Sequence, residues 1–123
     1  MSEKYKMANP EGMYFLTMTI VHWIDVFTRR ELCEVMVKSI QYCQKEKGLV
    51  VYGGCIMSSH VHLIISSHQE KTADVIRDLK KFTAKELVKE VTHINESRRE
   101  WLLNAFLKSL YFSGNKVKPA AYL

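Results

Sequence analysis

The chain has 123 residues, a length that allows one domain with a single core and excludes a large barrel enzyme. Hydrophobic residues make up 47% and charged residues 25%, the proportions of an ordinary globular protein rather than a disordered or fibrous one. The formal net charge of +5 is compatible with a polyanionic partner, although net charge bears on association and not on fold.

The three cysteines, Cys33, Cys43 and Cys55, are odd in number and show no Cys-x-x-Cys spacing. Neither a disulfide framework nor a cysteine zinc site is therefore predicted. The longest uncharged run, residues 13–24, is too short for a membrane-spanning helix, which needs about 20 apolar residues. We expect a cytoplasmic protein with reduced, buried thiols and no membrane association.

The first expected element is a strand at residues 13–21, which follows a flexible lead-in at residues 1–12. Aromatic and β-branched residues dominate the strand, as is typical of sheets. One of its faces is uniformly apolar and should cover the core: Tyr14, Leu16, Met18 and Ile20. The other face carries Thr17 and Thr19 and should remain partly open to solvent or ligand.

A helix is expected at residues 28–47. Thr28 followed by Glu31 is a capping-box pattern, in which the threonine side chain caps the helix start. Gly48 stands where a glycine commonly ends a helix.

Residues 49–52 and 60–66 read as strands with a polar break between them. Gly53 and Gly54 interrupt the first of them, and glycines inside a strand mark a bulge or a close approach of another backbone. The sequence leaves open whether this region is a hairpin or one sharply bent pair.

His60 and His62 are separated by one apolar residue, Val61. In a strand, alternate residues share a face, so both imidazoles lie on one side while Val61 lies on the other. Imidazole is the commonest neutral metal ligand, and this spacing predicts a two-point metal clamp. The competing interpretation, two half-exposed strand histidines without a ligand, applies to most isolated His-x-His pairs.

A second helix is expected to begin at Thr72. Its apolar residues share one arc of the helical wheel: Val75, Ile76, Leu79, Phe82, Thr83, Leu87 and Val91. Arg77, Lys81 and Lys85 recur every four residues on the opposite side. This row is either a solvated charged face or, in a basic protein, a surface for nucleic-acid phosphates.

A third helix is expected from Ser97, where a capping-box pattern recurs. Residues 101–112 are apolar on nearly every side, so such a helix must be buried on more than one side. The following residues 113–123 are too few to cover it. Two alternatives stay open: a second copy of the chain buries the helix in a homodimer, or residues 104–123 are a non-native or truncated C-terminus.

The expected order is strand, helix, strand, strand, helix, helix within one domain spanning residues 1–123. This order predicts an α+β fold, a ferredoxin-like antiparallel sheet with helices packed on one face. The other sheet face would then be free to carry the two histidines and a ligand.

With the fold expected, the histidine segment resembles a known motif. Together with the basic helix after it, the segment is similar to the HUH motif (His, hydrophobic, His) of single-tyrosine transposases, a family that includes insertion-sequence and REP-associated transposases. The segment reads Met57-Ser58-Ser59-His60-Val61-His62-Leu63-Ile64. Met-Pro-Asn usually precedes the first histidine in the family, and here Ser58 and Ser59 replace the last two. The resemblance covers roughly residues 13–91.

The resemblance implies that His60 and His62, with a third polar ligand, bind Mg²⁺ or Mn²⁺ and act on single-stranded DNA. The DNA would be a hairpin end of a mobile or repeat element. A tyrosine on a later helix would attack the phosphate and form a 5′-phosphotyrosine intermediate. Tyr111 has the family spacing for this nucleophile and Asn115 for the third ligand, although Gly114 between them would end a helix.

Two outcomes follow from the resemblance: a transposase domain that cuts and rejoins DNA, or an inactive remnant that only binds it. An RNA-binding module is disfavoured because the central strands are expected to offer only Tyr52 for base stacking. A two-histidine phosphoesterase would need a second such motif, which is missing. The scattered His22, His68 and His93 are expected to be surface or structural residues.

Overall fold

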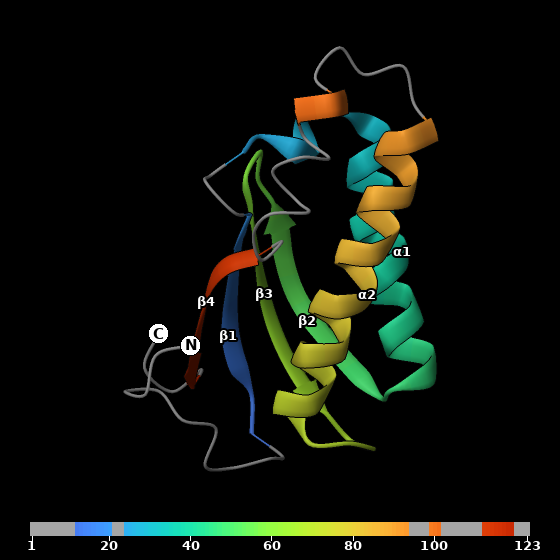
Figure 1. Cartoon of the computed structure of the whole chain (residues 1–123). Helices are drawn as coiled ribbons and strands as arrows, with labels where there is room; N and C mark the ends of the chain where they lie inside the picture. The colour runs from blue at the N-terminus through green and yellow to red at the C-terminus, as the bar shows by residue number, and fades with distance from the viewer. Residues whose placement is uncertain (1–11, 21–23, 94–98, 102–111, 120–123) are drawn as a thin grey trace.

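The computed structural model describes residues 12–20, 24–93, 99–101 and 112–119 (Figure 1). The elements follow one another as β1 (Tyr14–Ile20), the 3-10 turn η3 (Val26–Thr28), α1 (Arg30–Glu46), β2 (Leu49–Ile56), β3 (His60–Ser67), α2 (Thr72–His93) and β4 (Phe112–Pro119).

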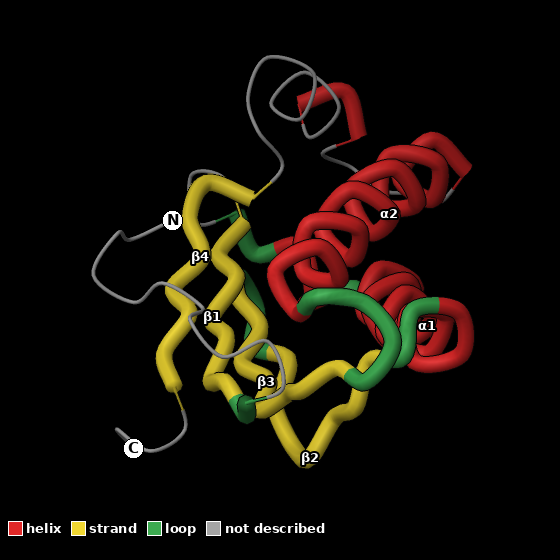
Figure 2. The backbone as a smooth tube through the Cα atoms, turned by 90° about the horizontal axis from the view of Figure 1, so that it is seen from below, coloured by secondary structure: helices red, strands yellow, loops and turns green. Residues whose placement is uncertain are grey.

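The four strands form one sheet in the order β2-β3-β1-β4, and each neighbouring pair is antiparallel. One helix joins β1 to β2 and another joins β3 to the chain that leads to β4. This is the split β-α-β arrangement of ferredoxin-like folds. Both helices lie on the same side of the sheet (Figure 2). The predicted α+β, ferredoxin-like fold is therefore confirmed.

The two faces of the sheet differ in burial. Along β1, and along β3 up to Ile65, buried and half-buried residues alternate. The buried row joins the helices in one core: Tyr14, Leu16, Met18, Ile20, Val61, Leu63 and Ile65. The half-buried row forms the opposite side, which we call the helix-free face: Phe15, Thr17, Thr19, His60, His62 and Ile64. Among the described residues, no helix covers this face (Figure 2).

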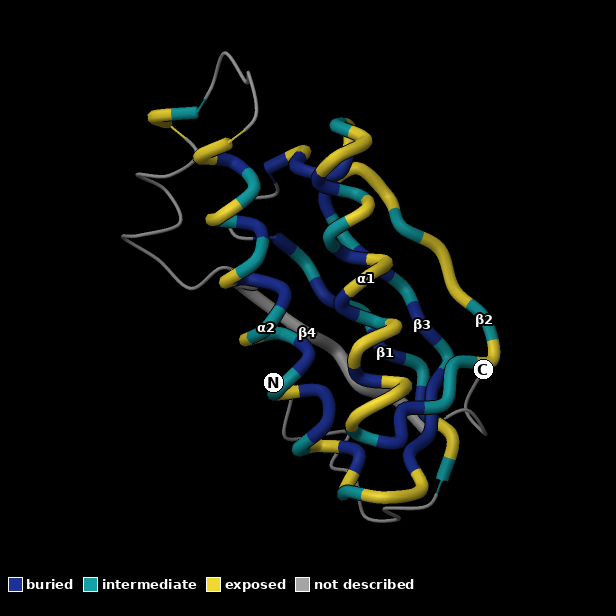
Figure 3. The backbone as a smooth tube through the Cα atoms, turned by 90° about the vertical axis from the view of Figure 1, so that its right-hand side faces the viewer, coloured by how far each residue is buried: buried dark blue, intermediate teal, exposed yellow. Residues whose placement is uncertain are grey.

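The helix layer packs through apolar stripes, and its outward side is exposed (Figure 3). On α2 the predicted arc is confirmed for six residues: Val75, Ile76, Leu79, Thr83, Leu87 and Val91. Phe82 is only half-buried and stacks instead on Tyr42 of α1, with 4.4 Å between the ring centroids. None of the described helices is long and apolar enough to cross a membrane.

Helix α1 ends as predicted but begins differently. Gly48 follows its last turn with a φ of 75°, the left-handed conformation that glycine adopts without strain. At the start, the N-cap is Arg29, without a side-chain cap, and the predicted capping box at Thr28 is wrong. Thr28 instead closes η3, where its hydroxyl donates to the Asp25 carbonyl at 2.9 Å.

Strands β2 and β3 form a hairpin, which settles the alternative left open by the sequence. The register shifts between Val51 and Gly53, so a bulge lies beside the glycines as predicted. A Cβ at Gly54 would overlap the carbonyl oxygen of His62 and the Leu63 side chain, whereas one at Gly53 would meet nothing within 4 Å. Gly54 therefore allows β2 to approach β3 at the histidines.

Strand β4 corrects the prediction for the end of the chain. Residues 99–101 are helical, as expected, but Phe112–Pro119 is a strand paired along β1 and not the end of a helix followed by a tail. Its sequence has few apolar or β-branched residues, so the strand signal is weak. Backbone pairing with β1 determines its conformation.

The three thiols differ in burial. Cys43 is buried and Cys33 half-buried, but Cys55 is exposed on the edge strand β2. The expectation that all three are buried is therefore wrong for Cys55.

Candidate metal and nucleic-acid site

His60 and His62 lie side by side on the helix-free face, as the strand alternation predicts. Their ring centroids are 4.8 Å apart, and the rings meet edge to face. Both side chains are half-buried, while Val61 between them is fully buried in the core. The central strand β3 therefore presents two imidazoles to the same space at a fixed spacing.

Neighbouring side chains hold both rings. Across the sheet, β1 places Thr17 opposite His62, and the Thr17 Oγ1 lies 3.0 Å from His62 Nδ1. Phe15, also on β1, stacks against the His62 ring with 5.6 Å between centroids and a 28° tilt. The Ser59 hydroxyl lies 3.3 Å from His60 Nδ1. In each histidine the Nδ1 atom therefore lies within hydrogen-bonding distance of a hydroxyl group.

The protonation chemistry of His62 suits a metal ligand. Burial, and secondly the charge of His60, lowers the pKa of His62 from the ordinary 6.5. The ring is therefore neutral at pH 7 and can offer a lone pair. Two imidazoles on one strand, with their Nδ1 atoms in contact with hydroxyl groups, form a donor set that fits a divalent cation.

No third His, Cys, Asp or Glu side chain joins the two histidines in the described part of the chain. Those residues contain no group of three or more His, Cys, Asp or Glu side chains able to hold a metal ion. Cys55 pairs with His62 in the β2–β3 register and is exposed, but it completes no such group. The backbone of Asn115 lies in β4 opposite Met18, and Tyr111 lies outside the described residues.

The predicted nucleic-acid residues lie on the other side of the molecule. Arg77, Lys81 and Lys85 are all exposed on α2, in the helix layer, whereas the histidines lie on the helix-free face. The structure therefore divides the predicted site between two opposite faces.

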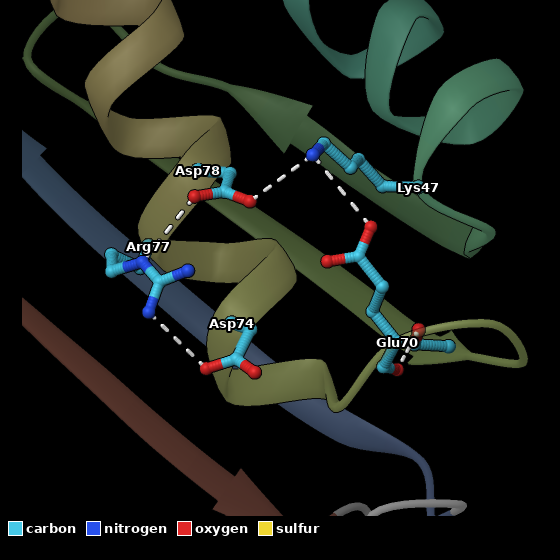
Figure 4. A network of polar contacts seen from close by, with 6 residues as sticks. Lys47, Glu70, Asp74, Arg77 and Asp78 are labelled. Atoms are coloured by element: carbon cyan, nitrogen blue, oxygen red, sulfur yellow. Dashed lines mark hydrogen bonds and ion pairs between the residues drawn. The ribbon is translucent and has the colours of Figure 1, made fainter.

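Arg77 differs from the two lysines in its neighbours. Its guanidinium pairs with Asp74 and Asp78, each at 3.3 Å, and Asp78 also pairs with Lys47 at 3.4 Å (Figure 4). Lys81 and Lys85 form no ion pair within the described parts of the chain. Lys81 and Lys85 are thus the more available positive charges of the basic row.

Sequence reasoning missed the residues that support the site. Phe15 is an aromatic of a central strand, while Tyr52, the only aromatic expected there, lies on the edge strand β2. Thr17 was assigned to the open face, but its contact with His62 depends on strand register, which no local signal gives. His68 and His93 are exposed, and His22 lies outside the described residues.

The fold and the site together define a ferredoxin-like protein with a two-histidine cluster on its helix-free face. The sequence pattern of the family described as "Transposase IS200 like" matches residues 13–115. The chain belongs to this family of transposases, and the predicted resemblance is confirmed.

Two of the solved structures that share the fold are described as transposases. One is a protein assigned as a transposase from Deinococcus radiodurans R1, with a TM-score of 0.65 and 16% identity over 94% of this chain and 84% of that one. The other is a REP-associated tyrosine transposase bound to a REP hairpin, with a TM-score of 0.60 and 12% identity. The match spans 97% of this chain and 62% of that one. No curated protein sequence matches the chain.

Proposed function

We propose that the chain is a transposase domain that binds single-stranded DNA hairpins, at the ends of a mobile or repeat element, and cuts and rejoins one strand. The observation that carries this proposal is the pair of imidazoles on the helix-free face, 4.8 Å apart between ring centroids. The similar fold of a transposase bound to a REP hairpin supports a hairpin as the DNA partner. The whole chain would act as one domain, in the cytoplasm where such DNA is present.

His60 and His62 are the residues that would hold a divalent cation, Mg²⁺ or Mn²⁺, through their ring nitrogens. When bound, such an ion supplies Lewis-acid polarisation of a phosphate oxygen. The strand keeps both rings in place, because Thr17 and Ser59 engage their Nδ1 atoms. Asn115 stays a proposed third ligand, although its backbone pairs with the core-facing Met18, so the register of β4 puts position 115 on the sheet face opposite the histidines.

The proposed nucleophile is Tyr111. Its phenolic oxygen would attack the scissile phosphorus and form a 5′-phosphotyrosine bond, while the bond from phosphorus to the 3′ oxygen breaks. The departing 3′ oxygen takes a proton and leaves as a hydroxyl. Because one phosphodiester replaces another, the strand can be rejoined by the reverse attack without ATP.

We further propose that Lys81 and Lys85, with Arg77 beside them, contact DNA phosphates. Their exposure and the lack of described ion pairs on the two lysines support this role. The basic row would then hold a duplex stem on the helix layer, while the strand to be cut reaches the helix-free face.

A homodimer remains part of the proposal. Trp101, in the short helical segment 99–101, leaves 56% of its surface exposed, and an exposed large aromatic is typical of an interface. Sedimentation equilibrium of the wild type and Trp101→Glu tests it. A dimer that weakens in the variant is expected, and a wild-type monomer at all concentrations would refute it.

The alternative is an inactive remnant that binds DNA without cutting it. The observation that favours it is that, among the described residues, no third His, Cys, Asp or Glu joins His60 and His62 in a metal-binding group. In this alternative the chain still binds a DNA hairpin through the basic row, but it forms no phosphotyrosine intermediate.

Covalent capture separates the two functions. Wild type is incubated with a DNA hairpin and Mn²⁺ or Mg²⁺, and the protein–DNA adduct is measured on a denaturing gel. We expect an adduct that His60→Ala and Tyr111→Phe abolish and that His68→Ala, a change at an exposed histidine outside the pair, retains. No adduct with either metal, together with salt-sensitive hairpin binding that both His60→Ala and Tyr111→Phe retain, would select the alternative.

A further inference from the structure

Thr17 is the side chain that reaches His62 from a different strand. Its Oγ1 lies 3.0 Å from His62 Nδ1, and the two residues are opposite one another in the β1–β3 register. Directly opposed residues of an antiparallel pair have the closest side chains in a sheet. The contact is therefore fixed by the two central strands.

A neutral imidazole carries one proton on one of two nitrogens, and its hydrogen-bond partners select which. If Nδ1 holds the proton, it donates to Thr17 Oγ1, and Nε2 keeps a lone pair directed away from β1. If Nε2 holds the proton, the Thr17 hydroxyl donates to Nδ1, and the outward nitrogen cannot bind a metal. The identity of the donor thus decides what the site can bind.

We infer that Thr17 is a positioning residue that holds His62 in its Nδ1–H tautomer and so prepares Nε2 as a metal ligand. Phe15 supports this arrangement by stacking on the His62 ring and limiting its rotation. The inference rests on the proposed metal-binding function but concerns a different residue, which touches neither metal nor DNA in the proposal.

Thr19 provides a matched control. It lies two residues along β1 on the same face, half-buried and opposite His60, and no hydrogen bond of its side chain is described. Thr19→Val therefore makes the same chemical change as Thr17→Val in nearly the same surroundings. Thr17→Ser keeps the hydroxyl and serves as the conservative rescue.

The first measurement is the tautomer of His62 in the metal-free protein, read from long-range ¹⁵N–¹H correlations of the imidazole above pH 7.5. We expect the Nδ1–H form to predominate in wild type, Thr17→Ser and Thr19→Val. In Thr17→Val it should give way to the Nε2–H form. A wild-type ring in the Nε2–H form, or a tautomer unchanged by Thr17→Val, would overturn the inference.

The second measurement is the Mn²⁺ dissociation constant. Loss of a supporting hydrogen bond typically weakens metal binding about 10–100-fold, and we expect Thr17→Val near the lower end of this range. Thr17→Ser should restore most of the affinity, and Thr19→Val should retain it. Equal weakening by Thr17→Val and Thr19→Val would assign the effect to general packing and contradict the inference. If wild type binds no Mn²⁺, the proposed function fails, and the tautomer measurement still decides the role of Thr17.

Discussion

His62 is held by three neighbours of different chemistry: a hydroxyl at Nδ1, an aromatic ring against its face and a second imidazole at its edge. These contacts fix the ring, and burial disfavours its charged form. The same surroundings would be unusual for a solvated surface histidine. At this scale the strand alternation predicted the pair correctly, but it could not predict Thr17 as a contact. Thr17 and His62 are 45 residues apart, and only the register brings them together.

The imidazole of His62 should titrate below pH 6.5 in the folded, metal-free protein, as followed by NMR. In His60→Gln the pKa should rise, because the charge of His60 no longer opposes protonation, but burial should keep it below 6.5. Since the folded-state pKa is the lower one, the unfolded chain binds more protons in acid. His62 therefore lowers the free energy of unfolding as the pH falls from 6.5 toward its folded-state pKa. A pKa of His62 at or above 6.5 would contradict this account.

Single elements show where local sequence patterns suffice. The strand at β1, the hairpin glycines and the apolar arc of α2 follow from residue type and periodicity, and the structure confirms them. The predicted helix cap at Thr28 is wrong because the Thr28 hydroxyl donates its hydrogen bond to the Asp25 carbonyl at η3 instead. Strand β4 was missed because its pairing with β1, and not its composition, makes it a strand.

Gly54 and Gly53 give a test of the hairpin beside the histidines. Gly54→Ala places a methyl group against the His62 carbonyl and the Leu63 side chain, and such overpacking costs about 1–3 kcal/mol. Gly53→Ala meets open space, so its free energy of unfolding should change by less than about 0.5 kcal/mol. Urea unfolding of both variants measures the difference. An equal decrease in the free energy of unfolding in Gly54→Ala and Gly53→Ala would show that β2 does not approach β3 closely at Gly54.

The proposed phosphate contacts of the basic row on α2 can be tested by the salt dependence of DNA binding. Each phosphate contact that is removed should lower the slope of log affinity against log salt by about 1. We expect this change for Lys81→Gln and for Lys85→Gln in hairpin binding. Arg77→Gln should change the slope less, because its guanidinium already pairs with Asp74 and Asp78. Slopes unaffected by either lysine variant would remove the basic row from the DNA surface.

At the scale of the whole molecule, the sheet separates the two groups of predicted site residues. The helices lie on one side of the sheet (Figure 2), with the exposed basic row on α2, and the histidines lie on the helix-free face. The predicted fold, with the helices on one sheet face and the histidines on the other, already implies this separation. Under the proposed function, metal chemistry and stem binding would therefore occur on opposite faces of one domain.

The central claim, that the helix-free face is the metal-binding face, is tested most directly by mapping Mn²⁺ on the folded protein. Paramagnetic broadening of amide signals falls steeply with distance from the ion. With sub-stoichiometric Mn²⁺, the signals of Phe15, Ile64 and their neighbours on β1 and β3 should broaden, and those of Val37 and Lys45 on α1 should remain sharp. His62→Ala should abolish the pattern. Broadening centred on the helix layer, or a pattern unchanged in His62→Ala, would contradict the account.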